Sequence, residues 1–130
     1  MSFKFDTKEK FTVIKPEESH FTANMADQLT SLLQEQMHKT PPHVILNFER
    51  VTEMDPNALD ILVDSCIPFR RALHSLVVCC LQPHPYALAD AADVLETLNY
   101  APTESEAWDI VQMEEMEREF LADDENNEIQ

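Results

Sequence analysis

The stretch that decides the fold runs Pro41-Pro42-His43-Val44-Ile45-Leu46-Asn47-Phe48-Glu49-Arg50-Val51-Thr52-Glu53-Met54-Asp55-Pro56-Asn57-Ala58-Leu59. Residues 43–48 form an almost continuous apolar run between prolines and a charged pair, which is typical of a buried central strand. Asp55-Pro56 favours a helix start, because Asp is a good N-cap and proline fits the first helical position. We expect this helix to end near Leu73. Its predicted core face consists of Leu59, Leu62, Val63, Cys66, Phe69 and Leu73.

Further strands and helices are predicted on either side of this stretch. Short runs with aromatic or β-branched residues at 3–6 and 11–15 indicate an N-terminal hairpin. Apolar residues at helical spacing over 25–37 indicate a helix, with Thr22 or Asn24 as its cap. Downstream we expect a buried strand at 76–81, a turn at 83–85, a helix over 88–99, a short strand around Tyr100 and a helix over 105–121.

The alternation of strands and helices predicts an α/β fold, because strand, helix, strand units pair their strands in parallel. We expect a sandwich with a mixed sheet of four to five strands and about four helices, most of them on one face. Residues 1–121 are predicted to form a single domain, followed by an acidic, disordered tail at 122–130.

Composition excludes several classes of function. The 130 residues contain no glycine, so the chain has neither a P-loop nor a dinucleotide fingerprint. The formal charge of −16 argues against binding to nucleic acid or to anionic membrane surfaces. Neither a membrane-spanning run nor an apolar signal core is present, and three cysteines make a poor disulfide framework. We expect a cytoplasmic protein.

The charge is concentrated at the C-terminal end. Residues 101–130 hold 11 acidic residues and one basic residue, Arg118, whereas residues 1–100 have a net charge of −6. This segment either keeps the protein in solution or steers a basic partner towards it.

Catalytic and metal-binding patterns are lacking in the sequence. The histidines lie near the ends of predicted elements, and none has the spacing of a zinc site. Cys66 falls on a helix core face, and Cys79 and Cys80 fall in a strand, so none resembles a reactive thiolate at a helix N-terminus. We therefore expect no enzyme, no metal and no cofactor. The distinctive site is the strand-to-helix junction at 51–59, since α/β folds bind ligands and partners at the carboxyl ends of parallel strands. At this junction Asp55 is expected to cap the helix through the amide of Asn57 or Ala58, which is worth about 1 kcal/mol.

The junction resembles the STAS family, the domain shared by sulfate transporters and anti-sigma factor antagonists. The strand and loop up to Asp55 and the helix from Pro56 are similar to that family's strand, loop and Asp-Ser-Ser-Gly-Leu helix start. Residues 21–29, 76–81 and 102–107 resemble the first helix, the next strand and the entry to the last helix. The acidic ending further resembles stand-alone bacterial members of the family.

The resemblance implies an anti-sigma factor antagonist, which is not an enzyme and which binds an anti-sigma factor with serine kinase activity. In such proteins the kinase phosphorylates the serine that follows the Asp. That position here is Pro56, which has no hydroxyl; Asn57 and Ala58 replace the second serine and the glycine, and Thr22 stands where many members carry Asp. The predicted partner-binding residues are Thr22, Asn24, Glu53, Met54, Asp55, Pro56, Asn57, Ala58 and Leu59.

Two other functions fit the same resemblance and the same junction. One is an accessory subunit of a transporter or lipid-transport complex, as other STAS domains are. The other is a regulatory module that binds a small anion or nucleotide at the helix start. The expected state is a monomer or a weak homodimer.

Overall fold

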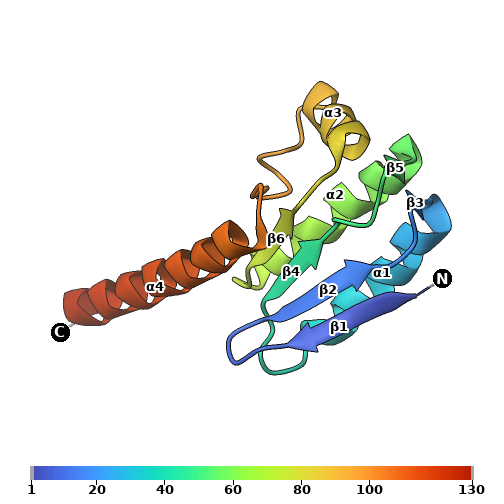
Figure 1. Ribbon diagram of the computed structural model, residues 1–130. Helices are drawn as coiled ribbons and strands as arrows, with labels where there is room; N and C mark the ends of the chain where they lie inside the picture. The colour runs from blue at the N-terminus through green and yellow to red at the C-terminus, as the bar shows by residue number, and fades with distance from the viewer. Residues whose placement is uncertain (1, 130) are drawn as a thin grey trace.

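A computed structural model describes the backbone of residues 2–129 and the side chains of residues 2–122. Its main sheet has four strands in the order β1-β2-β4-β6 (Figure 1). β1 pairs antiparallel with β2, while β2, β4 and β6 are mutually parallel. The predicted mixed sheet is therefore confirmed, and the short strand expected near Tyr100 is reduced to one bridge between Cys79 and Ala101. The strands of this sheet are Phe3–Thr7 (β1), Thr12–Pro16 (β2), Val44–Asn47 (β4) and Leu76–Cys79 (β6).

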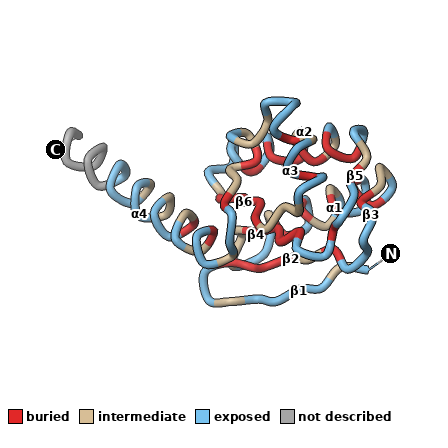
Figure 2. The backbone as a smooth tube through the Cα atoms, turned by 45° about the horizontal axis from the view of Figure 1, so that its top comes forward, coloured by how far each residue is buried: buried red, intermediate tan, exposed pale blue. Residues whose placement is uncertain are grey.

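Side chains alternate between the two faces of the sheet, as strand geometry requires. One face carries Ile14, Leu46 and Val78 and packs against α1 (Ala23–Gln36) and α2 (Pro56–Arg71). This face forms the larger hydrophobic core, which also receives residues around α3 (Pro83–Ala91). The other face carries Val13, Ile45, Val77 and Cys79, and a smaller cluster joins it to the start of α4 (Glu104–Ile129). Figure 2 shows that buried backbone is concentrated in β2, β4, β6, α1 and α2.

Two predicted elements differ from the structure. The expected turn at 83–85 is wrong, because Pro83 begins α3, where its fixed φ and missing N–H are tolerated. The helix expected over 88–99 ends at Ala91, and Leu98 is buried in the turn that follows. Leu73 was predicted to be core but is 68% exposed, because α2 ends at Arg71 and its last turn does not reach that far.

Because the chain contains no glycine, residues of other types adopt the left-handed backbone conformation. Leu73, Cys80, Asp93 and Asn99 have φ values between 53° and 62°. Asn and Asp tolerate this region well, whereas the Cβ of Leu or Cys clashes with the neighbouring carbonyl and costs roughly 1–2 kcal/mol. Leu73, Cys80 and Asp93 follow the ends of α2, β6 and α3, where glycine often stands, and Asn99 lies in the turn at 95–99.

The last helix extends away from the body of the protein (Figure 1). Its N-terminal part packs on the sheet through Ala107 and Val111, which are fully buried. The backbone is helical past the predicted end at Leu121 and up to Ile129. The predicted disorder of the tail at 122–130 concerns residues that lie almost wholly outside those whose side chains are described, and it stays a prediction.

Candidate functional site

A second, two-stranded sheet organises the junction between β4 and α2. β3 (His20–Phe21) and β5 (Glu53–Met54) pair in parallel, with His20 opposite Glu53 and Phe21 opposite Met54. The backbone N–H groups of Thr52 and Glu53 donate to the carbonyl of Ser19 at 2.8 and 3.1 Å, and the N–H of Asp55 donates to the carbonyl of Phe21 at 3.0 Å. The segment predicted as a loop is therefore held firmly against β3. Because β3 leads into α1 and β5 leads into α2, this pairing brings the two helix starts together.

Three of the predicted contact residues belong to the core. Met54 is 2% exposed, Ala58 0% and Leu59 3%, and all three pack in the larger cluster. Phe21, which is also fully buried, meets Phe48 edge-on with ring centroids 5.2 Å apart. These side chains lie in the core beneath the junction and do not reach its surface.

Asp55 does not cap α2, which corrects the expectation from the sequence. Its side chain accepts no hydrogen bond from the first-turn amides of α2. Instead, one carboxylate oxygen lies 2.7 Å from Nε2 of His20, and both side chains are about half exposed. This hydrogen bond is the main reason why the pKa of His20 is raised above its ordinary value, with smaller contributions from the charges of Asp55 and Glu53.

The start of α1 is capped in the ordinary way. The Oγ1 atom of Thr22 accepts a hydrogen bond from the N–H of Met25 at 3.3 Å, so Thr22 is the cap and Asn24 lies within the first turn. Asn24 is exposed. In α2 the same place is taken by Asn57, which is likewise exposed and follows Pro56 at the first helical position.

Two histidines that the sequence did not single out take part in the junction. His20 pairs with Asp55, and Nδ1 of His84, in the first turn of α3, accepts a hydrogen bond from the N–H of Met54 at 3.4 Å. His20 lies 35 residues before Asp55 along the chain. The only sequence signal that could have found it was its place just before the predicted cap of the first helix.

The exposed part of this junction is called here the junction surface. It consists of His20, Asn24, Glu53, Asp55, Pro56 and Asn57. These residues offer hydrogen-bond donors and acceptors and a net negative charge on a rigid base, which suits recognition of another molecule. Figure 1 shows β3, β5 and the starts of α1 and α2 at the end of the body away from α4.

The thiols are unsuited to nucleophilic chemistry. Burial raises the pKa of Cys66 to about 11, and burial also raises the pKa values of Cys79 and Cys80. Among the described residues, no group of three or more His, Cys, Asp or Glu side chains could hold a metal ion.

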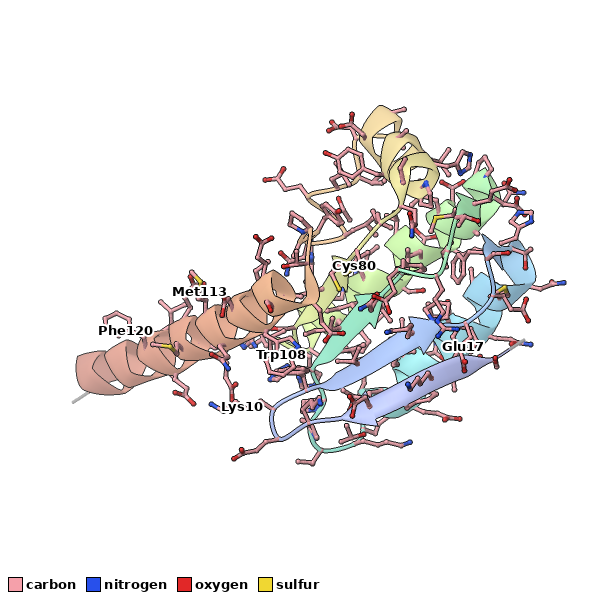
Figure 3. All side chains as sticks on the ribbon, viewed as in Figure 1. Lys10, Glu17, Cys80, Trp108, Met113 and Phe120 are labelled. Atoms are coloured by element: carbon pink, nitrogen blue, oxygen red, sulfur yellow. The ribbon has the colours of Figure 1, made fainter. Side chains whose placement is uncertain are left out.

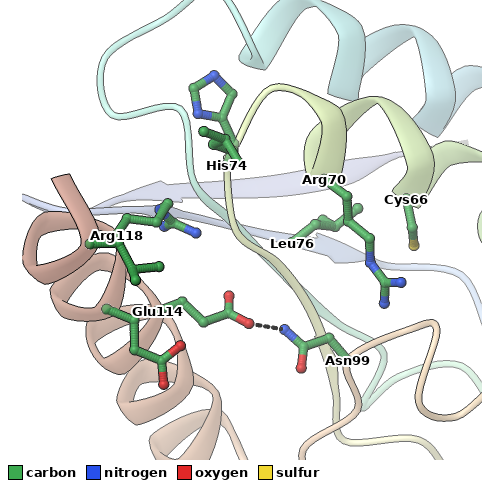
Figure 4. Close-up of a pocket in the computed structure, with 10 residues that line it drawn as sticks. Cys66, Arg70, His74, Leu76, Asn99, Glu114 and Arg118 are labelled. Atoms are coloured by element: carbon green, nitrogen blue, oxygen red, sulfur yellow. Dashed lines mark hydrogen bonds between the residues drawn. The ribbon is translucent and has the colours of Figure 1, made fainter. Parts of the chain in front are cut away.

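A cavity of about 330 Å³ lies far from the junction surface, between the end of α2, the start of β6 and α4 (Figure 4). Its polar groups are largely engaged. Arg70 donates to the carbonyls of Glu96 and Thr97, Arg118 donates to the Ser75 hydroxyl at 2.9 Å, and the Glu114 carboxylate accepts from the Asn99 amide at 3.0 Å. The contacts of Arg118 and Glu114 join α4 to the body.

No helix in the part of the chain that the structure describes has the length and apolar character needed to cross a membrane.

Comparison with known families and structures identifies the architecture. The profile of the STAS domain matches residues 2–107. A crystal structure from Thermotoga maritima, described as a putative anti-sigma factor antagonist, has a TM-score of 0.75 at 14% identity, covering 85% of this chain and 94% of that one. The anti-sigma factor antagonist SpoIIAA in its unphosphorylated form has a TM-score of 0.69 at 17% identity, covering 85% and 96% of the two chains.

A third similar structure has a different description. It is a sulfate transporter family protein from Wolinella succinogenes, with a TM-score of 0.70 at 16% identity, covering 84% of this chain and 90% of that one. No curated protein matches the sequence of the present chain. At identities this low the structural likeness shows the fold alone.

Proposed function

The chain belongs to the STAS domain family, and on that premise we propose that it is a non-catalytic protein-interaction module of the anti-sigma factor antagonist type. STAS domains are generally regulatory modules without catalytic activity, and the similar structures include antagonists that act by binding another protein. The observation that carries the proposal is the junction surface: exposed polar side chains on a rigid base at the carboxyl edge of the parallel strands. The module would regulate transcription in the cytoplasm of a bacterium.

The proposed partner is an anti-sigma factor that resembles a serine kinase. On the resemblance of the sequence to the STAS family, Pro56 would occupy the position of the phosphorylated serine, and residues 55–59 contain no hydroxyl side chain. Pro56 is exposed at the first position of α2, so a kinase could reach this place but would find no acceptor. Phosphorylation of a serine at this position would add roughly two negative charges and release the partner. Without that serine, the module stays in the state that binds its partner.

The first test uses the anti-sigma kinase encoded in the same genome, with ATP and Mg²⁺, and reads the intact mass of the wild-type chain and of two variants. We expect the kinase to phosphorylate Pro56→Ser but not the wild type. Asn57→Ser, which places a hydroxyl one residue further along α2, is the matched control and stays unmodified. A phosphoryl group on wild-type Thr22 or Thr52, which flank the junction, would overturn the proposed loss of the switch.

A second test asks whether the junction surface binds the kinase. Glu53→Arg reverses an exposed charge on this surface and is expected to weaken the complex at least about tenfold, or 1.4 kcal/mol, in a calorimetric titration. Asp64→Arg makes the same change on an exposed site of α2 outside the surface and serves as the control. Equal losses in both variants would show that net charge, and not the junction surface, governs binding.

A transporter-linked role is the second candidate. It is favoured by the likeness to the Wolinella succinogenes sulfate transporter family protein, which rests on the fold. Genes next to this one separate the two candidates: permease genes favour the transporter role, and a serine kinase or sigma factor gene favours the antagonist.

A further inference from the structure

The outer part of α4 carries apolar side chains that are more than half exposed. Ala107 and Val111 are fully buried against the sheet. Beyond them, Met113 is 59% exposed, Met116 67% and Phe120 66%. Figures 1 and 2 show this part of α4 projecting from the body as exposed helix. We call Met113, Met116 and Phe120 the outer stripe.

The outer stripe lies on one face of α4, and that face points away from the body. Its residues follow each other at i, i+3 and i+7, the spacing that aligns side chains along a helix. At about 100° per residue the stripe lies roughly opposite Ala107 and Val111. In Figure 3 Met113 and Phe120 project from the side of α4 that faces away from Trp108, which packs against Phe11. Folding of the body therefore cannot bury the stripe.

Carboxylates flank the outer stripe, and Lys10 lines a small hollow with Met116 and Glu119. Asp109 and Glu117 lie beside it on the same helical face, and Glu119 borders it on the other side. The only basic residue in the described part of α4 is Arg118, and its guanidinium is turned to the body, where it donates to Ser75. Leu121, which is 60% exposed, forms a shallow apolar groove with Met116, Phe120 and Glu117.

Charge decides between the possible occupants of this face. A second copy would bring two segments with a net charge of −10 each to helix-packing distance, roughly 8–10 Å between axes, which is comparable to the Debye length at physiological ionic strength, so their repulsion is only partly screened. A helix with its own apolar stripe and flanking Lys or Arg side chains satisfies both the apolar and the acidic components. Methionine suits such a surface, because its flexible side chain adapts to different partners. We propose that the outer stripe of α4 binds a basic amphipathic helix of a partner protein, at a site separate from the junction surface.

The test uses the full chain and a fluorescent synthetic peptide of about 18 residues, with leucines at helical spacing and lysines on both flanks. Fluorescence anisotropy at physiological ionic strength should show saturable binding of this peptide. The triple variant Met113→Gln, Met116→Gln, Phe120→Gln is expected to weaken it at least about tenfold. The matched control, Phe5→Gln, Ile67→Gln, Tyr86→Gln, replaces three exposed apolar side chains outside α4 and should bind as the wild type does.

Three outcomes would overturn the proposal. A scrambled peptide of the same composition could bind equally well, which would reduce the interaction to charge. The outer-stripe variant could bind as tightly as the control variant. Sedimentation equilibrium could show a wild-type dimer that the outer-stripe variant loses, which would assign the stripe to a second copy. Circular dichroism checks that both triple variants remain folded, which we expect because the substituted positions are exposed.

Discussion

The starts of α1 and α2 correspond position by position, but the residues at equivalent positions make different contacts. His20-Phe21-Thr22-Ala23-Asn24 leads into α1, and Glu53-Met54-Asp55-Pro56-Asn57 leads into α2, with His20 paired to Glu53 and Phe21 to Met54 in the small sheet. Thr22 caps its helix, whereas Asp55, in the same place, leaves its helix uncapped and bonds to His20 across the sheet. Asp55, which is a good capping residue, thus forms a contact that joins the two helix starts. Differences between equivalent positions show what each start contributes.

The largest effects are expected in the first turns, where both helices are anchored in the core. Met25 is 1% exposed and Leu59 is 3% exposed. Met25→Ala and Leu59→Ala should each lower the free energy of unfolding by about 2–5 kcal/mol, because each leaves a cavity. Urea denaturation measures both. Asn24→Ala and Asn57→Ala, at exposed positions in the same turns, are the controls and should change stability by less than about 0.5 kcal/mol. If Leu59→Ala lowers the free energy of unfolding as little as these two controls do, Leu59 does not lie in the core.

The next effect separates the two caps. Thr22→Ala removes the hydrogen bond to the Met25 amide and should cost about 1 kcal/mol of unfolding free energy. Asp55→Ala should cost measurably less in urea denaturation at pH 8, because Asp55 makes no cap hydrogen bond and its contact with His20 is exposed to solvent. An equal cost in both variants would mean that Asp55 caps α2 in solution.

These two starts also show how far the sequence predicts the fold. The apolar runs of β4 and β6 and the helical stripes of α1 and α2, apart from Leu73, agree with the sequence prediction, because burial leaves a periodic pattern in the residues. β3 and β5 were missed, since two-residue strands are too short to show a period. Pro83 and Pro85 suit both a turn and the first helical turn, so the sequence predicts a turn at the place where α3 begins.

At the junction, the sequence predicts which segment forms the site but not which contacts its residues make. Local capping rules narrow the cap of α1 to Thr22 or Asn24, and Thr22 is the cap, because the cap and its amide lie three residues apart. The same rules failed for Asp55, because its contact with His20 depends on pairing between segments 35 residues apart. Helical spacing predicts the burial of Leu59, whereas the burial of Met54 and Ala58 depends on how this segment packs against the sheet.

A smaller effect concerns the proton on His20. Asp55→Asn should lower the pKa of His20 towards its ordinary value of 6.5, and Glu53→Gln should lower it less, because the hydrogen bond to Asp55 is the main cause of the shift. NMR titration of the imidazole measures both, and Thr22→Ala, at the equivalent position of the other start, should leave the titration unchanged. Since the folded-state pKa is raised, the pair stabilises the fold below pH 6.5, and this contribution is lost as the pH rises through the raised pKa. A His20 pKa at or below 6.5 in the wild type would show that the pair is absent in solution.

The smallest expected effect compares the two exposed asparagines, each in the second position of its helix. A carboxylate there interacts favourably with the helix dipole, so Asn24→Asp should raise the free energy of unfolding by about 0.3–1 kcal/mol. Asn57→Asp should give a smaller gain or none, because Glu53 and Asp55 already place negative charge beside the start of α2, whereas His20 and Thr22 occupy the equivalent places before α1. Repulsion between exposed charges is screened by salt, so denaturation in about 1 M NaCl should bring the two variants closer together. If Asn57→Asp stabilises as much as Asn24→Asp at low salt, the carboxylates of the junction surface are too far from the helix start to repel an anion there.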